Sequence, residues 1–355
     1  MAKAGPASVE IRNVSMRYGT VTAVDNVSFT IQPGTLVTLL GPSGCGKTTT
    51  LRMIAGLEIA SEGRILIGGK DVTKHSAADR DVSMVFQSYA LFPHMSVLDN
   101  AAYGPSVKGL GKARAQEMAL EKLALVGLQG FEKRYPSELS GGQQQRVAVA
   151  RALVLEPQVL LFDEPLSNLD AKLRRRVRED IRELQQSLNL TVAYVTHDQE
   201  EALAVSDRII VMSNAKIAQE GAPRELYEQP ANGFVADFIG DANLVDVMVT
   251  AVEGDSAEVE IGPARITLPR RGLGLGPAKV AIRPESLILS ADPGEGVLPG
   301  TIRKAAYLGN HLDIMVATPV GELFVVQYGE RRLPEAGSAV FVRFAGSGVT
   351  LIPPG

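Results

Sequence analysis

The sequence predicts an α/β domain with a mainly parallel sheet and a helical insert, followed by a small all-β domain. Short β-rich runs alternate with helical patterns over residues 8–240, which is typical of a parallel sheet covered by helices. Within this part, residues 90–155 show helical periodicity and no buried strand. After residue 240, short alternating runs are separated by Gly, Pro and charged pairs. We therefore expect domains at 1–240 and 241–355, with the helical subdomain at about 90–155.

Three apolar runs of the first domain are predicted to be central strands. They are LVTLL (36–40), VLLF (159–162) and TVAYVT (191–196), and their continuous apolar character is typical of strands buried on both faces. Each run is followed by polar residues and then by a helical pattern. Because open parallel sheets bind ligands beyond the carboxyl ends of their strands, we expect the functional residues directly after these runs.

The helical insert and the second domain are each predicted from their periodicity. The insert contains KARAQEMALEKLALVGL (112–128), whose apolar residues recur at helical spacing. The second domain contains alternating runs such as VDVMVTAV, KVAI and LFVVQY, which predict a small barrel of OB-like type, about 115 residues long.

Composition and charge restrict the classes of protein to which the chain can belong. The net charge is −4, so no global basic signal points to nucleic acid, and we expect no nucleic-acid partner. The single cysteine, Cys45, excludes an internal disulfide and suits a reducing compartment. No apolar stretch approaches the ~20 residues that span a bilayer, and the N-terminus lacks a secretory apolar segment. We expect a cytoplasmic protein that reaches a membrane only through a partner.

Residues 41–48 (GPSGCGKT) fit the pattern G-x-x-x-x-G-K-[ST], directly after one predicted strand and directly before a helix. Glycines in such a loop let backbone N–H groups surround phosphates, and the helix N-terminus adds partial positive charge. Lys47 is expected to pair with the β- and γ-phosphates, and the Thr48 hydroxyl to bind Mg²⁺. An ordinary glycine turn with a surface lysine is the alternative, which the order of strand, loop and helix disfavours.

The sequence thus predicts a P-loop NTPase core. The residues expected to hold the nucleotide in this loop are Gly41, Pro42, Ser43, Gly44, Cys45, Gly46, Lys47, Thr48 and Thr49.

The residues that bind the metal and activate the attacking water are predicted to lie in the segment VLLFDEP (159–165). Asp163 ends a buried strand and can hold the Mg²⁺ shell, as in other P-loop nucleotide hydrolases. Glu164 follows at once and can orient or polarise the attacking water. Two carboxylates at a strand end could instead cap a helix, but Pro165 follows and a metal–phosphate site is already predicted nearby.

Three further residues are candidates for the site only because of their position in the sequence. His197 follows the run 191–196, so we place it beside the γ-phosphate, although a lone histidine is more often structural. Gln87 follows the run VSMVF and is a candidate for contact with Mg²⁺ or the attacking water. Tyr18 is a candidate for stacking on an adenine, with an exposed loop tyrosine as the alternative. The candidate catalytic residues are Glu164, His197, Gln87 and Lys47, and the candidate metal ligands are Thr48, Gln87 and Asp163.

The stretch LSGGQQQ (139–145) resembles a second phosphate loop but lacks a lysine. Ser140 and Gln143 have the spacing of a capping box at the start of a helix, which is the simpler interpretation. That interpretation leaves Gly141 and Gly142 without a reason, because glycine weakens a helix and exposes its backbone amides. Exposed amides at a helix start favour an anion, so both interpretations stay open on the residues alone.

Taken together, the motifs resemble the ATPase subunit of ABC transporters over about 230 residues. The elements that agree in order and spacing are GPSGCGKT, Gln87, LSGGQ (139–143), LLFDEP (160–165), SNLD (167–170) and His197. The resemblance implies that the nucleotide is ATP with Mg²⁺ and that Tyr18 stacks on its adenine. It also implies a head-to-tail dimer of two copies of the chain. In that dimer the residues that bind the partner's ATP or line the shared interface would be Ser140, Gly142, Gln143 and Asp170.

The second domain, with VAIRPESLIL (280–289), is similar to the regulatory barrel of importer ATPases. This likeness implies separate membrane permease subunits, which the surface near Gln87 and residues 88–100 would contact, and a periplasmic solute-binding protein. It also implies a peripheral position on the cytoplasmic side of the bacterial inner membrane. The solute expected is ferric iron, a polyamine or a phosphonate. A sugar importer is the alternative, followed by an exporter or a non-transport ABC ATPase.

Overall fold

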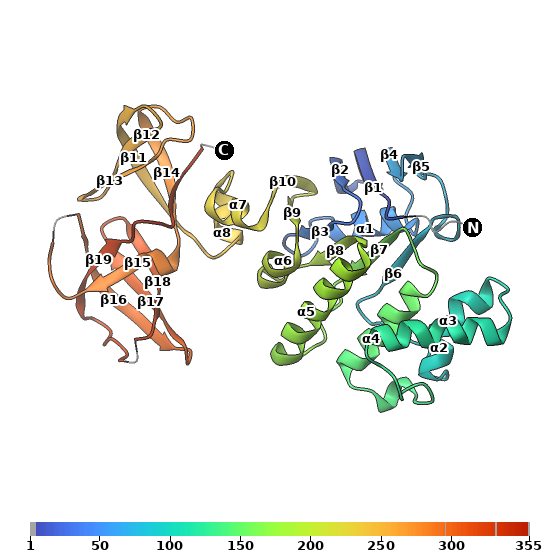
Figure 1. The fold of residues 1–355 in the computed structure, drawn as a ribbon. Helices are drawn as coiled ribbons and strands as arrows, with labels where there is room; N and C mark the ends of the chain where they lie inside the picture. Colours follow the sequence, from blue (N-terminus) through green and yellow to red (C-terminus); the bar gives the residue numbers. More distant parts are fainter. Residues whose placement is uncertain (1–4, 295, 331, 354–355) are drawn as a thin grey trace. The chain divides into compact units, whose positions relative to one another are not determined.

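The computed structural model describes residues 5–294, 296–330 and 332–353, and the chain divides into two compact units (Figure 1). The units are Met1–Pro223 and Arg224–Gly355. The short helix α7 (Pro223–Glu228) begins at the division, and α8 (Gly233–Phe238) belongs to the second unit. The domain limits expected from the sequence, with a boundary at 240, stay a prediction.

The first unit contains a six-stranded sheet that is parallel except at one edge. Its order is β10-β9-β3-β8-β7-β6, and only β10 runs antiparallel to its neighbour. The strands are β3 (Leu36–Leu40), β6 (Val82–Val85), β7 (Val159–Asp163), β8 (Thr191–Thr196), β9 (Arg208–Ser213) and β10 (Lys216–Gly221). The three apolar runs predicted as central strands are β3, β7 and β8, and each is buried along its whole length.

A second, antiparallel sheet in the same unit was not separated from the parallel sheet by the sequence patterns. Its order is β2-β1-β4-β5, made of β1 (Val9–Tyr18), β2 (Val21–Ile31), β4 (Glu62–Ile67) and β5 (Lys70–Asp71). The register between β1 and β2 shifts at three places, so apolar and polar residues do not alternate regularly along either strand.

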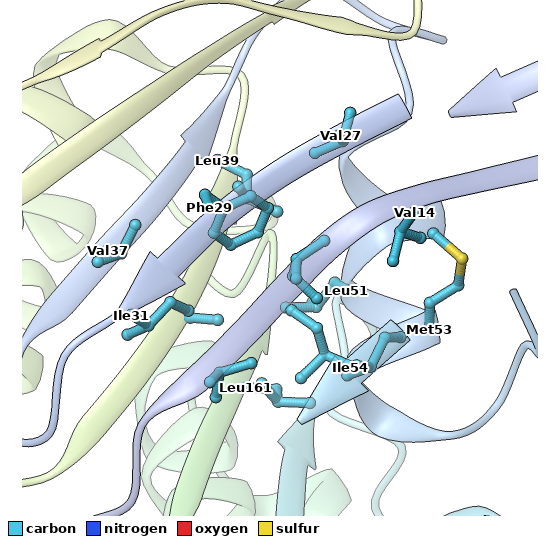
Figure 2. Packing of buried hydrophobic residues seen from close by; sticks show 14 of the residues in the cluster. Val14, Val27, Phe29, Ile31, Val37, Leu39, Leu51, Met53, Ile54 and Leu161 are labelled. Carbon is cyan, nitrogen blue, oxygen red and sulfur yellow. The ribbon is translucent and has the colours of Figure 1, made fainter. Parts of the chain in front are cut away.

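The core of the first unit lies on both faces of the parallel sheet. On one face, Leu39 of β3 and Leu161 of β7 pack with side chains of β2 and of helix α1 (Lys47–Ala55), as Figure 2 shows. On the other face, Leu160 and Phe162 of β7 pack against α5 (Ala171–Leu188) and part of α4 (Gly141–Leu153). The alternation of neighbouring β7 residues between two cores is what makes its sequence continuously apolar.

The structure contains a helical insert in the first unit. It consists of α2 (Val97–Val107), α3 (Lys112–Leu125) and α4, which share a core of small and aliphatic side chains. Helix α4 contributes to two cores, because Val147 faces the insert and Val149 faces the parallel sheet. The unit is completed by α6 (Gln199–Val205) and by the short 3₁₀ helices Ala77–Asp79 and Pro136–Glu138.

The second unit is all-β apart from α8, most of α7 and one 3₁₀ turn (Pro284–Ser286), in agreement with the sequence prediction. It has two five-stranded antiparallel sheets, ordered β13-β12-β11-β14-β20 and β15-β19-β16-β17-β18, whose inner faces share one apolar core. The strands are β11 (Asn243–Glu253), β12 (Ser256–Ile261), β13 (Ala264–Pro269), β14 (Gly276–Ile282), β15 (Leu287–Ser290), β16 (Leu298–Tyr307), β17 (His311–Thr318), β18 (Gly321–Tyr328), β19 (Ala339–Phe344) and β20 (Val349–Ile352).

The buried Arg283 fixes α8 inside this second unit, because its guanidinium donates hydrogen bonds to the carbonyl oxygens of Ala236 and Ile239. In the described part of the chain, no helix is both long enough and apolar enough to cross a bilayer.

Candidate nucleotide site at the carboxyl edge of the parallel sheet

Sheet register brings four separate segments of the chain to one edge. Leu40 of β3 pairs with Thr196 of β8, Asp163 of β7 pairs with Val195, and Val85 of β6 pairs with Phe162. The residues that follow these positions are the loop 41–46, Glu164, His197 and Gln87. Since parallel strands end at the same edge, the candidate residues that the sequence dispersed over more than a hundred positions gather there.

The loop between β3 and α1 has a backbone that only glycine can follow at two positions. At Gly46 the φ angle is 104°, and a Cβ atom would lie 2.4 Å from the carbonyl oxygen of Ala23. At Gly41 a Cβ atom would lie 2.3 Å from the carbonyl oxygen of Met212. These neighbours are backbone atoms and cannot turn aside, so the two glycines are fixed by sterics as well as by conformation.

Lys47 directs its charge into the loop that precedes it. Its ammonium donates hydrogen bonds to the carbonyl oxygens of Gly41 at 2.7 Å and Pro42 at 2.9 Å, and the residue is only 5% exposed. Cys45 is buried in the core beneath the loop. A cation held within a glycine loop at a helix N-terminus is suited to bind a polyphosphate.

Thr48 and Asp163 offer two oxygen ligands next to this cation. The Thr48 hydroxyl donates to Asp163 Oδ1 at 3.3 Å, and burial of Asp163 raises the pKa of its carboxyl against the opposing effect of that hydrogen bond. Mg²⁺ prefers hard oxygen ligands and binds through one or two carboxylates together with substrate phosphates. Within the described residues no group of three or more His, Cys, Asp or Glu could hold a metal by itself. The hydroxyl of Thr48 and the carboxylate of Asp163 are oxygen ligands of the kind that fits a Mg²⁺ ion bound together with a phosphate.

Glu164 is held next to His197 by a constrained backbone. Its φ angle is 44°, in the left-handed region, and its N–H donates to the carbonyl oxygen of Val195 at 3.0 Å. Its own carbonyl oxygen accepts hydrogen bonds from the backbone and side chain of Ser167. The carboxylate Oε2 is 3.0 Å from His197 Nδ1, so the structure joins two of the candidate catalytic residues directly. The carboxylate is one-fifth exposed, which leaves it accessible to water.

Tyr18 and Gln87 lie at the margins of the site. Tyr18 ends β1 and is 46% exposed; partial burial and Glu58 raise the pKa of its hydroxyl, and a hydrogen bond with Thr49 opposes this. Tyr18 therefore lies next to Thr49, the last of the residues predicted to hold the nucleotide. Gln87 is exposed, and its carbonyl oxygen accepts a hydrogen bond from Asn168 Nδ2 at 3.0 Å. The segment after β6 is thus tied to the segment after β7.

The segment 139–145 has the predicted capping box at the start of α4. Ser140 Oγ accepts from the N–H of Gln143, whose side chain accepts from the N–H of Ser140. The structure adds a reason for the glycines that the sequence reasoning missed. A Cβ atom on Gly142 would lie 2.9 Å from a terminal methyl group of Leu173 on α5, so a larger residue here would force the Leu173 side chain to move.

Asp170 caps α5 and remains exposed at the surface. Its carboxylate accepts a hydrogen bond from the N–H of Leu173 at 2.9 Å. Ser140 and Gln143 bond to each other at the start of α4, whereas the loop 41–48 bonds to itself and to Asp163. Within one chain, residues 139–145 and the loop 41–48 are therefore two separate parts of the surface.

Comparison with known proteins identifies the family. Residues 24–167 match the model of the ABC transporter family, and residues 280–352 match that of the TOBE domain. The chain is 60% identical to the Fe(3+) ions import ATP-binding protein FbpC of Agrobacterium fabrum over 347 residues, 98% of each chain. The chain belongs to the ABC transporter ATPase family. This ABC ATPase is also 58% identical to Fe(3+) ions import ATP-binding protein FbpC 1 of Rhizobium meliloti, with 99% of both chains covered.

A solved structure extends the comparison of this ABC ATPase to the fold. The protein, described as the dimeric structure of MJ0796, a bacterial ABC transporter cassette, aligns with a TM-score of 0.55 and 32% identity. The alignment covers 99% of that cassette and 61% of this chain. The predicted resemblance to ABC ATPases, the P-loop α/β core and the all-β second domain are confirmed.

Arg151 is a residue of this ABC ATPase that sequence reasoning missed. It lies on α4 and donates hydrogen bonds to the carbonyl oxygens of Tyr89 at 2.8 Å and Ala90 at 2.7 Å. Both acceptor residues have positive φ angles, 60° and 48°, in the segment that follows Gln87. No local sequence pattern predicts a left-handed backbone at two successive residues that are not glycine. The sequence therefore could not identify Arg151 as the residue that binds their carbonyl oxygens.

Proposed function

We propose that this chain is the ATP-hydrolysing subunit of a ferric-iron importer, and that two copies work as a pair on the cytoplasmic side of a bacterial inner membrane. The observation that carries the chemistry is the contact of 3.0 Å between Glu164 and His197 beside the loop 41–48. The solute class follows from the full-length identity of about 60% to relatives named as Fe(3+) import ATP-binding proteins.

The proposed roles divide between charge and proton transfer. Lys47 binds the β- and γ-phosphates, and Thr48 with Asp163 would hold Mg²⁺, which supplies positive charge to the phosphate oxygens. Glu164 accepts the proton of the water whose oxygen attacks the γ-phosphorus, while the bond to the leaving ADP oxygen breaks. His197 holds the Glu164 carboxylate in place through Nδ1. The exposed Gln87 side chain is proposed to contact the water or the metal.

The second copy is proposed to complete each site. Ser140, Gly142 and Gln143 lie at the start of a helix, where N–H groups that the capping box does not use can bind an anion. They supply the second contact for ATP held by the partner's loop, and Asp170 lies at the same interface. The hydrogen bond from Asn168 to Gln87 then links the interface segment 167–170 to the segment 88–100, where we place the permease contact.

An uptake experiment tests the solute and the energy source together. A bacterial strain lacking the gene would receive the wild-type gene or the Glu164→Gln variant, and uptake of radioactive Fe(III), putrescine, a phosphonate and maltose would be measured. We expect the wild-type gene to restore Fe(III) uptake alone, and the variant to restore nothing at equal protein level. Restored uptake of a different solute would refute iron, and full uptake with the variant would refute ATP hydrolysis as the energy source.

The same strain tests the partners. The tagged wild-type chain is expected to co-purify from detergent-solubilised membranes with permease subunits encoded beside its gene. Recovery of the chain in the soluble fraction alone, while Fe(III) uptake is active, would contradict the peripheral membrane position.

A further inference from the structure

A cavity of about 400 Å³ lies in the first unit, apart from the nucleotide loop and the other candidate site residues. Its walls come from the end of α3 and from the facing sides of α4 and α5. The wall is largely aliphatic, and its apolar members include Leu125, Val126, Val149, Val177, Ile181 and Leu184. A volume of this size accommodates a small organic molecule.

One polar side chain of the cavity wall is left without a partner. Gln145 of α4 is completely buried, and neither its Nε2 nor its Oε1 makes a hydrogen bond with any residue that the structure describes. The neighbouring Gln144, by contrast, donates to the carbonyl oxygens of Pro136 and Leu139. Because buried amides are nearly always hydrogen-bonded, an unpaired one in a cavity wall marks the place where a ligand can bond.

The charges around the cavity restrict the ligand. Arg146 is already paired with Asp180 at 2.6 Å, and Glu183 adds a carboxylate, so these three side chains together carry one negative charge. Among the described residues that line the cavity, no unpaired cation is available to compensate an anionic ligand. Gln145 offers one donor group and one acceptor group side by side, and its complement is a group that also carries both.

We propose that this cavity binds a small neutral molecule that bears a carboxamide or lactam group on an apolar ring. The Gln145 amide, which is buried in the unliganded chain, turns toward the cavity and exchanges two antiparallel hydrogen bonds with the amide of the ligand, and the ring occupies the aliphatic part of the cavity. The ligand binds between two helices that begin with the candidate interface residues Ser140 and Asp170. The helices touch near their starts, where a Cβ on Gly142 would meet Leu173, and the cavity lies further along both.

An occupied cavity therefore fixes the spacing of α4 and α5. Through that spacing it sets the relative position of the Ser140 and Asp170 segments and changes ATP turnover. This effect on turnover rests on the proposed function of those segments, whereas binding of the ligand does not.

Benzamide is the probe for a binding test on the full-length chain. Benzoate, which is anionic, and acetophenone, which lacks the donor, serve as controls of matched ring size. We expect benzamide to bind with a dissociation constant on the order of 1 mM, typical of a fragment of this size, and both controls to bind at least tenfold more weakly. A crystal structure of the wild-type chain soaked with benzamide should show the ligand amide within hydrogen-bond distance of Gln145.

The matched variants are Gln145→Leu and Gln186→Leu, the second of which makes the same change at an exposed position of α5 outside the cavity. We expect Gln145→Leu to weaken benzamide binding at least tenfold and to melt no lower than wild type, since it removes an unpaired buried amide. Gln186→Leu should bind benzamide as wild type does.

Four results would overturn the binding site: water alone at Gln145 in the soaked crystal, benzoate binding as tightly as benzamide, acetophenone doing so, or unchanged affinity in Gln145→Leu. The soaked wild-type crystal and the two control ligands decide the matter even if Gln145→Leu does not fold. Benzamide that binds at Gln145 without changing ATP turnover would overturn the helix-spacing effect. A chain that binds benzamide but hydrolyses no ATP would instead refute the proposed function.

Discussion

Replacing Glu164 by glutamine is the sharpest single test of the proposed chemistry. Gln has the same shape and the same backbone constraints, so the left-handed φ of 44° and the hydrogen bond to Val195 are retained. The neutral amide can still contact His197 Nδ1, now 3.0 Å from the carboxylate. What the variant loses is the capacity to take a proton from water. Its melting temperature should therefore stay close to that of wild type.

The expected loss follows from the usual contribution of a general base. Such a group accelerates a reaction by about 10² to 10⁴, which corresponds to roughly 3 to 5 kcal/mol of activation free energy. We expect phosphate release at saturating ATP to fall by about this factor, with ATP affinity nearly unchanged. Because each ATP is proposed to lie between two copies and the variant does not hydrolyse it, an ATP-bound dimer should accumulate and elute as such in size-exclusion chromatography.

The matched control is Glu200→Gln, which makes the same change on an exposed carboxylate of α6. Its turnover should equal that of wild type. If Glu164→Gln released phosphate within tenfold of the wild-type rate, Glu164 would not be the base and the assignment of the site would fail.

Three further substitutions test the site's other parts. Burial raises the pKa of Asp163, so the ionised carboxylate lowers the stability of the folded chain at neutral pH. Asp163→Asn should therefore abolish turnover yet melt at a higher temperature than wild type at pH 7. Calorimetry should show that this gain in melting temperature vanishes below the carboxyl's unfolded pKa of about 4. Gly46→Ala brings a Cβ against the carbonyl of Ala23 and should abolish ATP binding in equilibrium dialysis, whereas Gly69→Ala, with a positive φ but open space, should leave it intact. Tyr18→Ala should weaken ATP binding by about tenfold through lost stacking of roughly 1–3 kcal/mol, and equal affinity of Tyr18→Ala and Tyr18→Phe in the same dialysis would refute stacking.

The positions of the candidate residues could be predicted because the parallel sheet leaves a strong signal. Strands buried on both faces give continuous apolar runs, and residues 36–40, 159–162 and 191–196 are such runs. A motif that follows each run must then lie at one edge of the sheet. Spacing and chain order thus placed Asp163, Glu164 and His197 near the loop 41–48 without any knowledge of distances.

The antiparallel sheet could not be separated in the same way. Strand β1 pairs with β2 and β4, and its register with β2 shifts after Ile11, Val14 and Met16. Each shift breaks the two-residue alternation by which a half-buried strand is recognised. The sequence therefore indicated strands in this region but not the sheet to which they belong.

Buried arginines were also beyond sequence reasoning. Arg80 is 6% exposed and donates hydrogen bonds to the carbonyl oxygens of Met53 and Ile54 at the end of α1. Arg151 holds the segment after Gln87 in the same manner. In sequence such residues are indistinguishable from solvated ones, because their partners are backbone atoms of segments that only the fold brings near.

The central claim is that each ATP site is shared between two copies, and mixed variants test it most directly. Ser140→Arg should block the interface contribution of a chain, and Lys47→Ala should remove its phosphate binding, so each variant alone should be inactive. In a mixture of the two, a mixed dimer contains one site with an intact Lys47 and an intact partner Ser140. Single-turnover hydrolysis should then recover to about a quarter of the wild-type amplitude, since half of randomly formed dimers hold one intact site of two. A mixture as inactive as the separate variants would contradict the shared site.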